Sequence, residues 1–240
     1  MKRSSPVWTV LLKRELGALY QSPVAWIVTV LFLAFSGFLF FPTFFLVNRA
    51  EMRNFFSLLP ILFSFFLPAL TMRLLAEESR SGSLETLLTL PVTGAHVTAA
   101  KFLSVVVFVA GMLAPSLAYV FSIGMIGNPD PGPIAGGYLG ALFLAAAYAS
   151  IGLYASSVTK NQILAFFVAF SLCIMLTLAH QFAIFLPPFL VAPVEFLGSS
   201  SHFEAVSRGI LDTRDLLYFA SLTALFLAMT VRNLDDRRTA

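Results

Sequence analysis

Charged residues are scarce in this sequence: Asp, Glu, Lys and Arg make up 11% of its 240 residues, whereas soluble domains carry about 25%. Hydrophobic residues make up 58%, and 26 residues are Phe. A water-soluble core of this size could not bury so much apolar surface, so lipid must solvate much of the chain. The scarcity of charge therefore excludes an ordinary soluble protein and indicates a membrane protein.

Cysteine and histidine are also scarce, which limits metal, disulfide and hydrolase chemistry. Cys173 is the only cysteine, so neither an internal disulfide nor a cysteine metal cluster can form. The three histidines, His96, His180 and His202, are far apart in the sequence, whereas a zinc site needs clustered ligands. Ser171 and His180 are about 13 Å apart along a helix, too far to pair as nucleophile and base. We therefore expect no metal site and no membrane enzyme.

Lysine is rare as well, and its positions exclude one ATPase motif. A phosphate-binding loop ends in Gly-Lys-[Ser/Thr], but none of the four lysines follows a glycine. We therefore expect no ATPase site and no cofactor on this chain. Ionisable residues are nearly absent from the centres of the apolar runs. This absence disfavours a stand-alone secondary transporter, which would need them for ion coupling.

Long apolar runs dominate what is present. A helix needs about 20 apolar residues to cross a bilayer, and six runs meet this length. They are approximately Val24–Val47, Phe55–Leu75, Val97–Ile126, Gly137–Ser157, Ile163–Leu186 and Leu216–Val231. The sequence therefore predicts an all-α polytopic membrane protein with six transmembrane helices in one domain, residues 1–240.

The distribution of Lys and Arg predicts the orientation of these helices. One side holds 11 basic residues, in the N-terminal segment, the loop after the second run, the Lys160 loop and the C-terminal tail. The other side holds 4: Arg49, Arg53, Arg208 and Arg214. By the positive-inside rule, both termini and residues 76–96 are cytoplasmic. The net charge of +3 then reflects topology, and we expect no nucleic-acid partner.

Residues 4–22 have the spacing of a separate amphipathic helix. Ser4 or Ser5 can cap it, Pro6 suits its first turn, and Pro23 ends it. The face expected to meet the membrane interface contains Trp8, Leu11, Leu12, Leu16, Leu19 and Tyr20, and the other faces contain Lys13, Arg14, Glu15 and Gln21. This pattern is typical of a helix that lies in the membrane interface. It serves either as a simple anchor or as a contact for a cytoplasmic partner.

A polar segment at residues 76–93 separates the second and third runs. Pro60 and Pro68 can kink the second helix, which we expect to continue to about Arg80, where Gly82 breaks it. Ser83 is then a plausible cap of a short second helix, which would end at Pro91. Its apolar side would contain Leu84, Leu87, Leu88 and Leu90. The alternatives are a short helix held across the membrane surface and an ordinary solvated loop.

The pattern from Leu70 to Thr93, LTMRLLAEESRSGSLETLLTLPVT, resembles the membrane subunit of type-2 ABC exporters, and most closely the branch of the gliding-motility-associated permease. The acidic helix end, the Gly-Ser-x-Glu turn and the Leu-Leu-x-x-Pro-Val-Thr ending carry the resemblance. The specific motif covers about two dozen residues, whereas the layout of the amphipathic N-terminal helix and six spans covers nearly the whole chain.

The resemblance implies a coupling helix that docks on a separate ATP-binding cassette ATPase subunit. By motif position, its contact residues would be Glu77, Glu78, Arg80, Gly82, Ser83, Glu85, Leu88 and Pro91. A second six-span permease, identical or related, would complete the complex, with or without an accessory subunit. The resemblance also implies that the ATPase subunit holds ATP and Mg²⁺ and that the complex lies in the bacterial inner membrane. An apolar lining suits a hydrophobic, amphipathic or polymeric cargo. The alternative is a scaffold that transmits ATPase motion without transport.

Residues 187–215 are too apolar for a free loop. They suggest a short re-entrant pair that enters the outer leaflet and returns, packed against protein. The resemblance implies an outer gate here, with Phe189, Glu195, His202 and Glu204 near the mouth. The alternative is ordinary loop polarity.

Overall fold

A computed structural model of the protein describes residues 7–47, 51–85, 92–125, 127, 129–182, 187–209 and 212–239. The helices are α1 (Val7–Gln21), α2 (Pro23–Val47), α3 (Arg53–Thr71), α4 (Ala76–Ser81), α6 (Gly94–Leu113), the 3₁₀ turn η1 (Ala114–Ser116), α7 (Leu117–Gly124), α8 (Pro131–Val158), α9 (Gln162–Phe182), α10 (Pro188–Leu197), α11 (Ser199–Ser207) and α12 (Thr213–Thr239). No strand occurs in these ranges.

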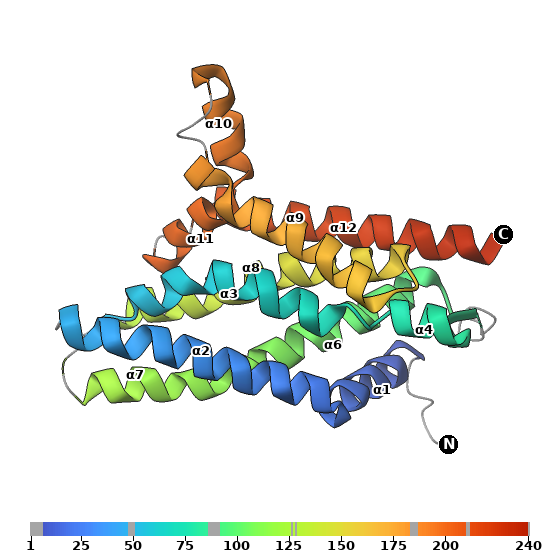
Figure 1. Ribbon diagram of the computed structural model, residues 1–240, viewed down its shortest axis with the longest axis horizontal. Coiled ribbons are helices and arrows are strands. Elements are labelled where there is room, and N and C mark those ends of the chain that lie inside the picture. Colours follow the sequence, from blue (N-terminus) through green and yellow to red (C-terminus); the bar gives the residue numbers. More distant parts are fainter. Residues whose placement is uncertain are drawn as a thin grey trace.

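Six helical segments in the described part of the chain are long and apolar enough to span a membrane. They cover residues 23–42, 53–81, 94–124, 131–158, 162–182 and 213–238. They run along the long axis of the molecule in Figure 1. Each overlaps one of the predicted runs, so the prediction of an all-α membrane protein with six spans is confirmed.

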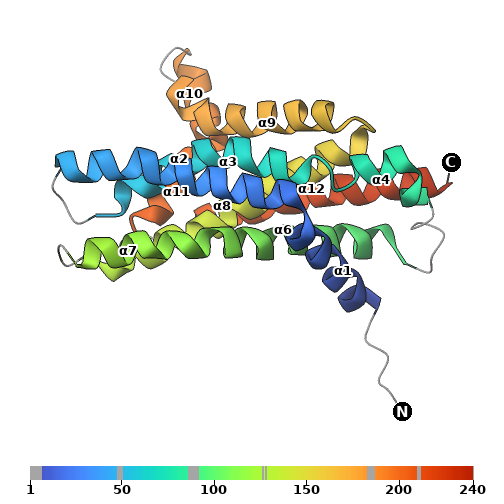
Figure 2. The ribbon, with the colours of Figure 1, turned by 60° about the horizontal axis from the view of Figure 1, so that its bottom comes forward.

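The two ends of the bundle carry different short helices. At one end, called the α4 end below, α4 lies near the C-terminal end of α12, and α1 leaves the bundle at an angle (Figures 1 and 2). Toward the other end, called the α11 end, α11 packs against the bundle and α10 projects away from it (Figure 1). The helices α10 and α11 occupy the segment that was predicted to form a re-entrant pair, with Gly198 between them.

Glycines of α8 allow α3 to pack closely against it. A Cβ atom at Gly137 would collide with the ring of Phe56, and one at Gly152 would collide with the side chain of Thr71. Both Phe56 and Thr71 are buried in α3. Large apolar side chains also remain on the outside, for example Phe38 at 74% exposure, as expected where lipid replaces water as the solvent.

Two spans are interrupted, which the sequence predicted only in part. The third span is broken between α6 and α7 by η1, which contains Pro115, and a proline cannot continue the helical hydrogen-bond ladder. The second span was expected to be helical as far as Arg80. Instead α3 ends at Thr71, residues 72–75 form a turn, and α4 is a separate short helix. The predicted break at Gly82 is confirmed, since Gly82 has the left-handed φ of 74°.

Candidate functional site

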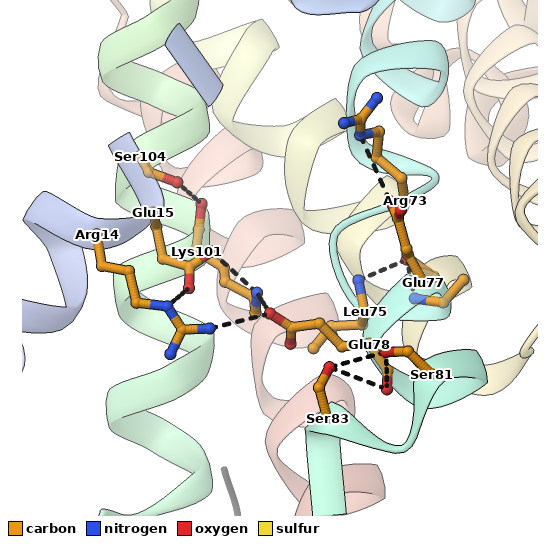
Figure 3. Close-up of polar contacts among 12 residues, drawn as sticks. Arg14, Glu15, Arg73, Leu75, Glu77, Glu78, Ser81, Ser83, Lys101 and Ser104 are labelled. Carbon is orange, nitrogen blue, oxygen red and sulfur yellow. Dashed lines mark hydrogen bonds and ion pairs between the residues drawn. The ribbon is translucent and has the colours of Figure 1, made fainter. Parts of the chain in front are cut away.

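A buried ionic cluster joins three helices at the α4 end (Figure 3). The ammonium group of Lys101 in α6 donates to Glu15 Oε2 of α1 at 2.9 Å and to Glu78 Oε1 of α4 at 2.8 Å. The side chain of Lys101 is 2% exposed, that of Glu15 9% and that of Glu78 18%. Because buried charges are costly unless they are paired, this cluster fixes α1 and α4 to α6 at one point.

A second cation borders the cluster on its solvent side. The guanidinium of Arg14 lies 3.7 Å from Glu78 and 3.9 Å from Glu15. Together, Arg14 and Lys101 balance the charges of the two carboxylates. The side chain of Arg14 is 56% exposed, however, so solvent weakens its interaction with them. The second carboxylate oxygen of Glu78 is buried and has no hydrogen-bond partner. Lys101 therefore supplies most of the compensation for both carboxylates.

The position of Glu15 corrects the predicted orientation of α1. The sequence placed Glu15 away from the apolar face, but in the structure Leu11, Glu15 and Leu19 form the buried stripe, at a spacing of one helical turn. This stripe faces α6, where Lys101 donates a hydrogen bond to the Glu15 carboxylate. Trp8, by contrast, is 43% exposed, and Leu12 is half-buried. Thus α1 is packed on the bundle through one stripe that contains a charge.

The turn between α3 and α4 is held by a serine from α8. The Ser156 hydroxyl accepts hydrogen bonds from the backbone N–H groups of Leu75 and Ala76, at 3.0 and 2.9 Å, and donates to the carbonyl of Met72 at 2.9 Å. Helix ends leave backbone N–H and carbonyl groups without intrahelical partners. Ser156 supplies partners for two such N–H groups at the start of α4 and for one carbonyl just beyond the end of α3. The sequence offered no local signal for this break, because its partner is about 80 residues away.

Ser83, just beyond Gly82, does not cap a new helix as the sequence predicted. Residues 83–85 are helical, and the Ser83 hydroxyl lies 2.9 Å from that of Ser81 and donates to the Glu78 carbonyl at 3.4 Å. Ser83 therefore reaches back to α4, whereas it was expected to cap a new helix. Leu84 is buried. The predicted contact residues Leu88 and Pro91 lie outside the described residues.

The charged residues among the predicted contacts, three in α4 and Glu85 just after Gly82, divide into two groups. Glu77, Arg80 and Glu85 are exposed, and Glu77 also lies 3.7 Å from Arg73. Glu78 points inward to Lys101 (Figure 3). The exposed group forms a charged outer face, and Glu78 connects that face to the interior. Their role in docking stays a prediction.

The predicted gate residues lie in α10 and α11, near the α11 end. Glu195 and Glu204 are exposed, next to His180 and Arg208 respectively. His202 is largely buried: its Nδ1 lies 2.7 Å from Asp215 Oδ1, and its Nε2 lies 2.9 Å from the Phe196 carbonyl oxygen. Phe189 is in α10, and its side chain is outside the described part of the structure.

Two α12 residues that sequence reasoning missed complete the surroundings of His202. Asp215 is its acidic partner, and the ring of Tyr218 stacks on the imidazole with 4.1 Å between ring centroids. The Tyr218 hydroxyl donates to the Leu197 carbonyl at 2.6 Å. The i, i+3 spacing of Asp215 and Tyr218 on one helical face was the available signal. These contacts fix the junction of α10 and α11 to the start of α12.

The α4 end differs from a metal centre in its residues and contacts. In the described ranges, no group of three His, Cys, Asp or Glu side chains is placed to hold a metal ion. The α4 end instead presents exposed charges on a short helix that is bound internally to α6 and α8. A force on this helix therefore acts on the spans behind it.

Comparisons with known proteins agree with this architecture. The profile described as ABC-2 family transporter protein matches residues 9–231, nearly the whole chain. A comparison with curated proteins finds no match. The profile covers α1 to α11 and most of α12, so it includes both the ionic cluster and the α10–α11 pair. The chain therefore belongs to the ABC-2 family of transporter proteins and is a membrane component of an ABC transporter.

Proposed function

We propose that this chain is the permease subunit of an ATP-driven exporter, and that a separate ATP-binding cassette subunit docks at the α4 end. The observation that carries this proposal is the buried Lys101 cluster, which joins α1, α4 and α6 directly behind the exposed charges of α4. An ABC transporter family implies an ATP-binding cassette partner. ATP and Mg²⁺ would be bound by that partner, and this chain would receive its motion.

The contacts provide a path for that motion. The partner would bind the exposed Glu77, Arg80 and Glu85. Glu78, which shares α4 with Glu77 and Arg80, is joined to Lys101 of α6, and the start of α4 is joined to Ser156 of α8. Displacement of α4 would therefore move spans three and four together, because paired charges in a low-dielectric interior are strongly held.

The remaining features of the proposal concern the whole complex. A second six-span permease, identical or related, would form the other half of the pathway, and an accessory subunit is possible in such a complex. Both termini would be cytoplasmic in a bacterial inner membrane, with the predicted gate residues on the outer side. The cargo would be hydrophobic, amphipathic or polymeric, and the gliding-motility branch stays a prediction. A mechanical subunit without cargo is the alternative.

The first experiment is purification of the tagged chain from its native host in mild detergent, with mass spectrometry of the proteins that accompany it. We expect a stoichiometric ATP-binding subunit. Recovery of the chain alone in several detergents would contradict the proposal. Export of cargo by the reconstituted complex would then distinguish a transporter from a purely mechanical subunit.

The docking assignment is tested by Glu85→Lys. Glu85 is exposed, so reversal of its charge should leave the fold intact but reduce recovery of the ATPase subunit and remove stimulated ATP hydrolysis. Glu51→Lys is the matched control, because Glu51 is also exposed but lines a cavity with Arg208 near the α11 end. If Glu85→Lys retains both assembly and stimulated hydrolysis, the docking assignment is wrong.

A further inference from the structure

The last turns of α12 contact both ends of the predicted docking segment, residues 76–93. Arg237 donates through Nη1 to the Ser79 hydroxyl in α4 at 2.8 Å. The next residue, Arg238, donates to the carbonyl of Val92 at 3.3 Å. Ser79 precedes Gly82, and Val92 directly precedes the residue that caps α6. Two neighbouring arginines of one helix therefore hold the beginning and the end of this segment.

The same turns of α12 are themselves held firmly by the bundle. Arg237 also donates through Nη2 to the Ser157 carbonyl at the end of α8, at 2.6 Å, and Asn233 donates to the Ser157 hydroxyl at 3.1 Å. Leu234 is fully buried. At the start of α6, a Cβ on Gly94 would lie 2.6 Å from Asp235 Oδ1, so α12 and α6 approach closely there. The end of α12 thus contacts α4, α6 and α8 at the α4 end.

The beginning of α12 holds the α10–α11 junction. Asp215 pairs with His202 of α11 at 2.7 Å, and the Tyr218 hydroxyl donates to the carbonyl of Leu197, the last residue of α10, at 2.6 Å. The two groups of contacts lie near opposite ends of one helix of 27 residues, and Asp215 and Arg237 are separated by about 33 Å along it at 1.5 Å per residue.

The sequence of α12 makes it stiffer than the other spans that approach the docking segment. It contains neither Pro nor Gly between Thr213 and Thr239, the residues at which helices usually kink. By contrast, α3 contains Pro60 and Pro68 and ends before α4, and the third span is interrupted at η1. A displacement at the end of α12 is therefore passed along it with less loss than along α3 or α6.

We propose that α12 is a coupling rod between the docking segment and the α10–α11 junction, and that Arg237 and Arg238 are the positioning residues that attach it to that segment. When the ATPase subunit moves the segment, Ser79 and Val92 carry the end of α12 with them. The start of α12 then moves Leu197 and His202. This inference rests on the proposed docking of an ATPase subunit at residues 76–93.

The test uses the complete complex with a reporter on α10. Glu195→Cys in a Cys173→Ala background provides a single exposed thiol, because Cys173 is the only cysteine and Glu195 is exposed. The rate of thiol labelling is measured without nucleotide and with ATP plus vanadate. We expect nucleotide to change the rate, and Arg237→Ala to remove most of that change while the ATPase subunit remains bound. Arg232→Ala is the control, since Arg232 is exposed on the same helix.

A second variant guards against misfolding of Arg237→Ala. Ser79→Ala removes only the partner of Arg237 Nη1, so it should reduce the nucleotide-dependent change, and the double variant should be no worse than Arg237→Ala alone. The inference is wrong if Arg237→Ala and Ser79→Ala both retain the full nucleotide-dependent change in labelling rate. It is also wrong if nucleotide does not change the labelling rate in a complex that is assembled and hydrolyses ATP. Absence of any bound ATPase subunit would instead overturn the proposed function, and this inference with it.

Discussion

Replacement of Lys101 by Met should weaken the attachment of α1 and α4 far more than a single surface change would. Lys101→Met keeps an unbranched side chain at a position that is 2% exposed but leaves Glu15 and Glu78 without their shared cation. Removal of one partner from a buried ion pair costs about 3–5 kcal/mol. Arg14 approaches both carboxylates, but it is 56% exposed and offsets about 1 kcal/mol at most. We therefore expect a loss of about 3 kcal/mol.

Thermal unfolding in detergent measures this loss. For a chain of this length, about 3 kcal/mol corresponds to a midpoint lower by about 6–12 °C. Lys13→Met is the matched control, since Lys13 lies on the exposed side of α1 and its loss should change stability by about 0.5 kcal/mol or less. A Lys101→Met variant that unfolds at the wild-type temperature would refute the reasoning.

A triple variant separates charge from packing. Glu15→Gln and Glu78→Gln combined with Lys101→Met leave no buried charge in the cluster, since the remaining cation, Arg14, is 56% exposed, and neutral replacement of a whole buried ionic group is often tolerated. We expect the unfolding midpoint of the triple variant to lie closer to that of the wild type than to that of Lys101→Met. If the triple variant is as unstable as Lys101→Met alone, the loss comes from packing and not from uncompensated carboxylates.

Two further predictions concern the contacts of α8. Ser156→Ala should cost about 1–3 kcal/mol, because it leaves the N–H groups of Leu75 and Ala76 without an acceptor, and faster amide hydrogen exchange at these two residues would report it. Gly152→Ala should lower the free energy of unfolding by about 1–3 kcal/mol, because the added Cβ collides with the side chain of Thr71, and a lower thermal midpoint would report it. Gly17→Ala is the control, since the space around Gly17 is open, and it should be neutral or stabilising by up to about 1 kcal/mol.

The spans could be predicted because bilayer thickness sets the length of an apolar run, and this constraint acts locally along the chain. The break at Gly82 was equally local, since glycine readily adopts a left-handed conformation at a helix end. The orientation of α1 was not predictable in this way. A rule that assigns charged residues to solvent placed Glu15 outside, whereas its partner Lys101 lies 86 residues later in the sequence.

The same limit explains what was missed at both ends of α12. Arg237 and Arg238 were counted only as basic residues that set orientation, yet they bind Ser79 and Val92, 158 and 146 residues earlier. Asp215 was not considered a partner of His202, because the connection depends on how α11 folds back against α12. Composition and spacing reveal which segments are helical, but long-range polar pairs depend on the packed arrangement.

The chain order of the ionic cluster bears on how the protein enters the membrane. An unpaired lysine opposes the insertion of a membrane helix, by about 2.5–3.5 kcal/mol at the helix centre and by less toward an end, and Lys101 lies seven residues after the start of α6. Lys101 follows Glu15 and Glu78 in the sequence, and chains are synthesised from the N-terminus. Both acidic partners have therefore left the ribosome before the helix that carries Lys101. Their carboxylates can then neutralise the lysine when that helix enters the lipid.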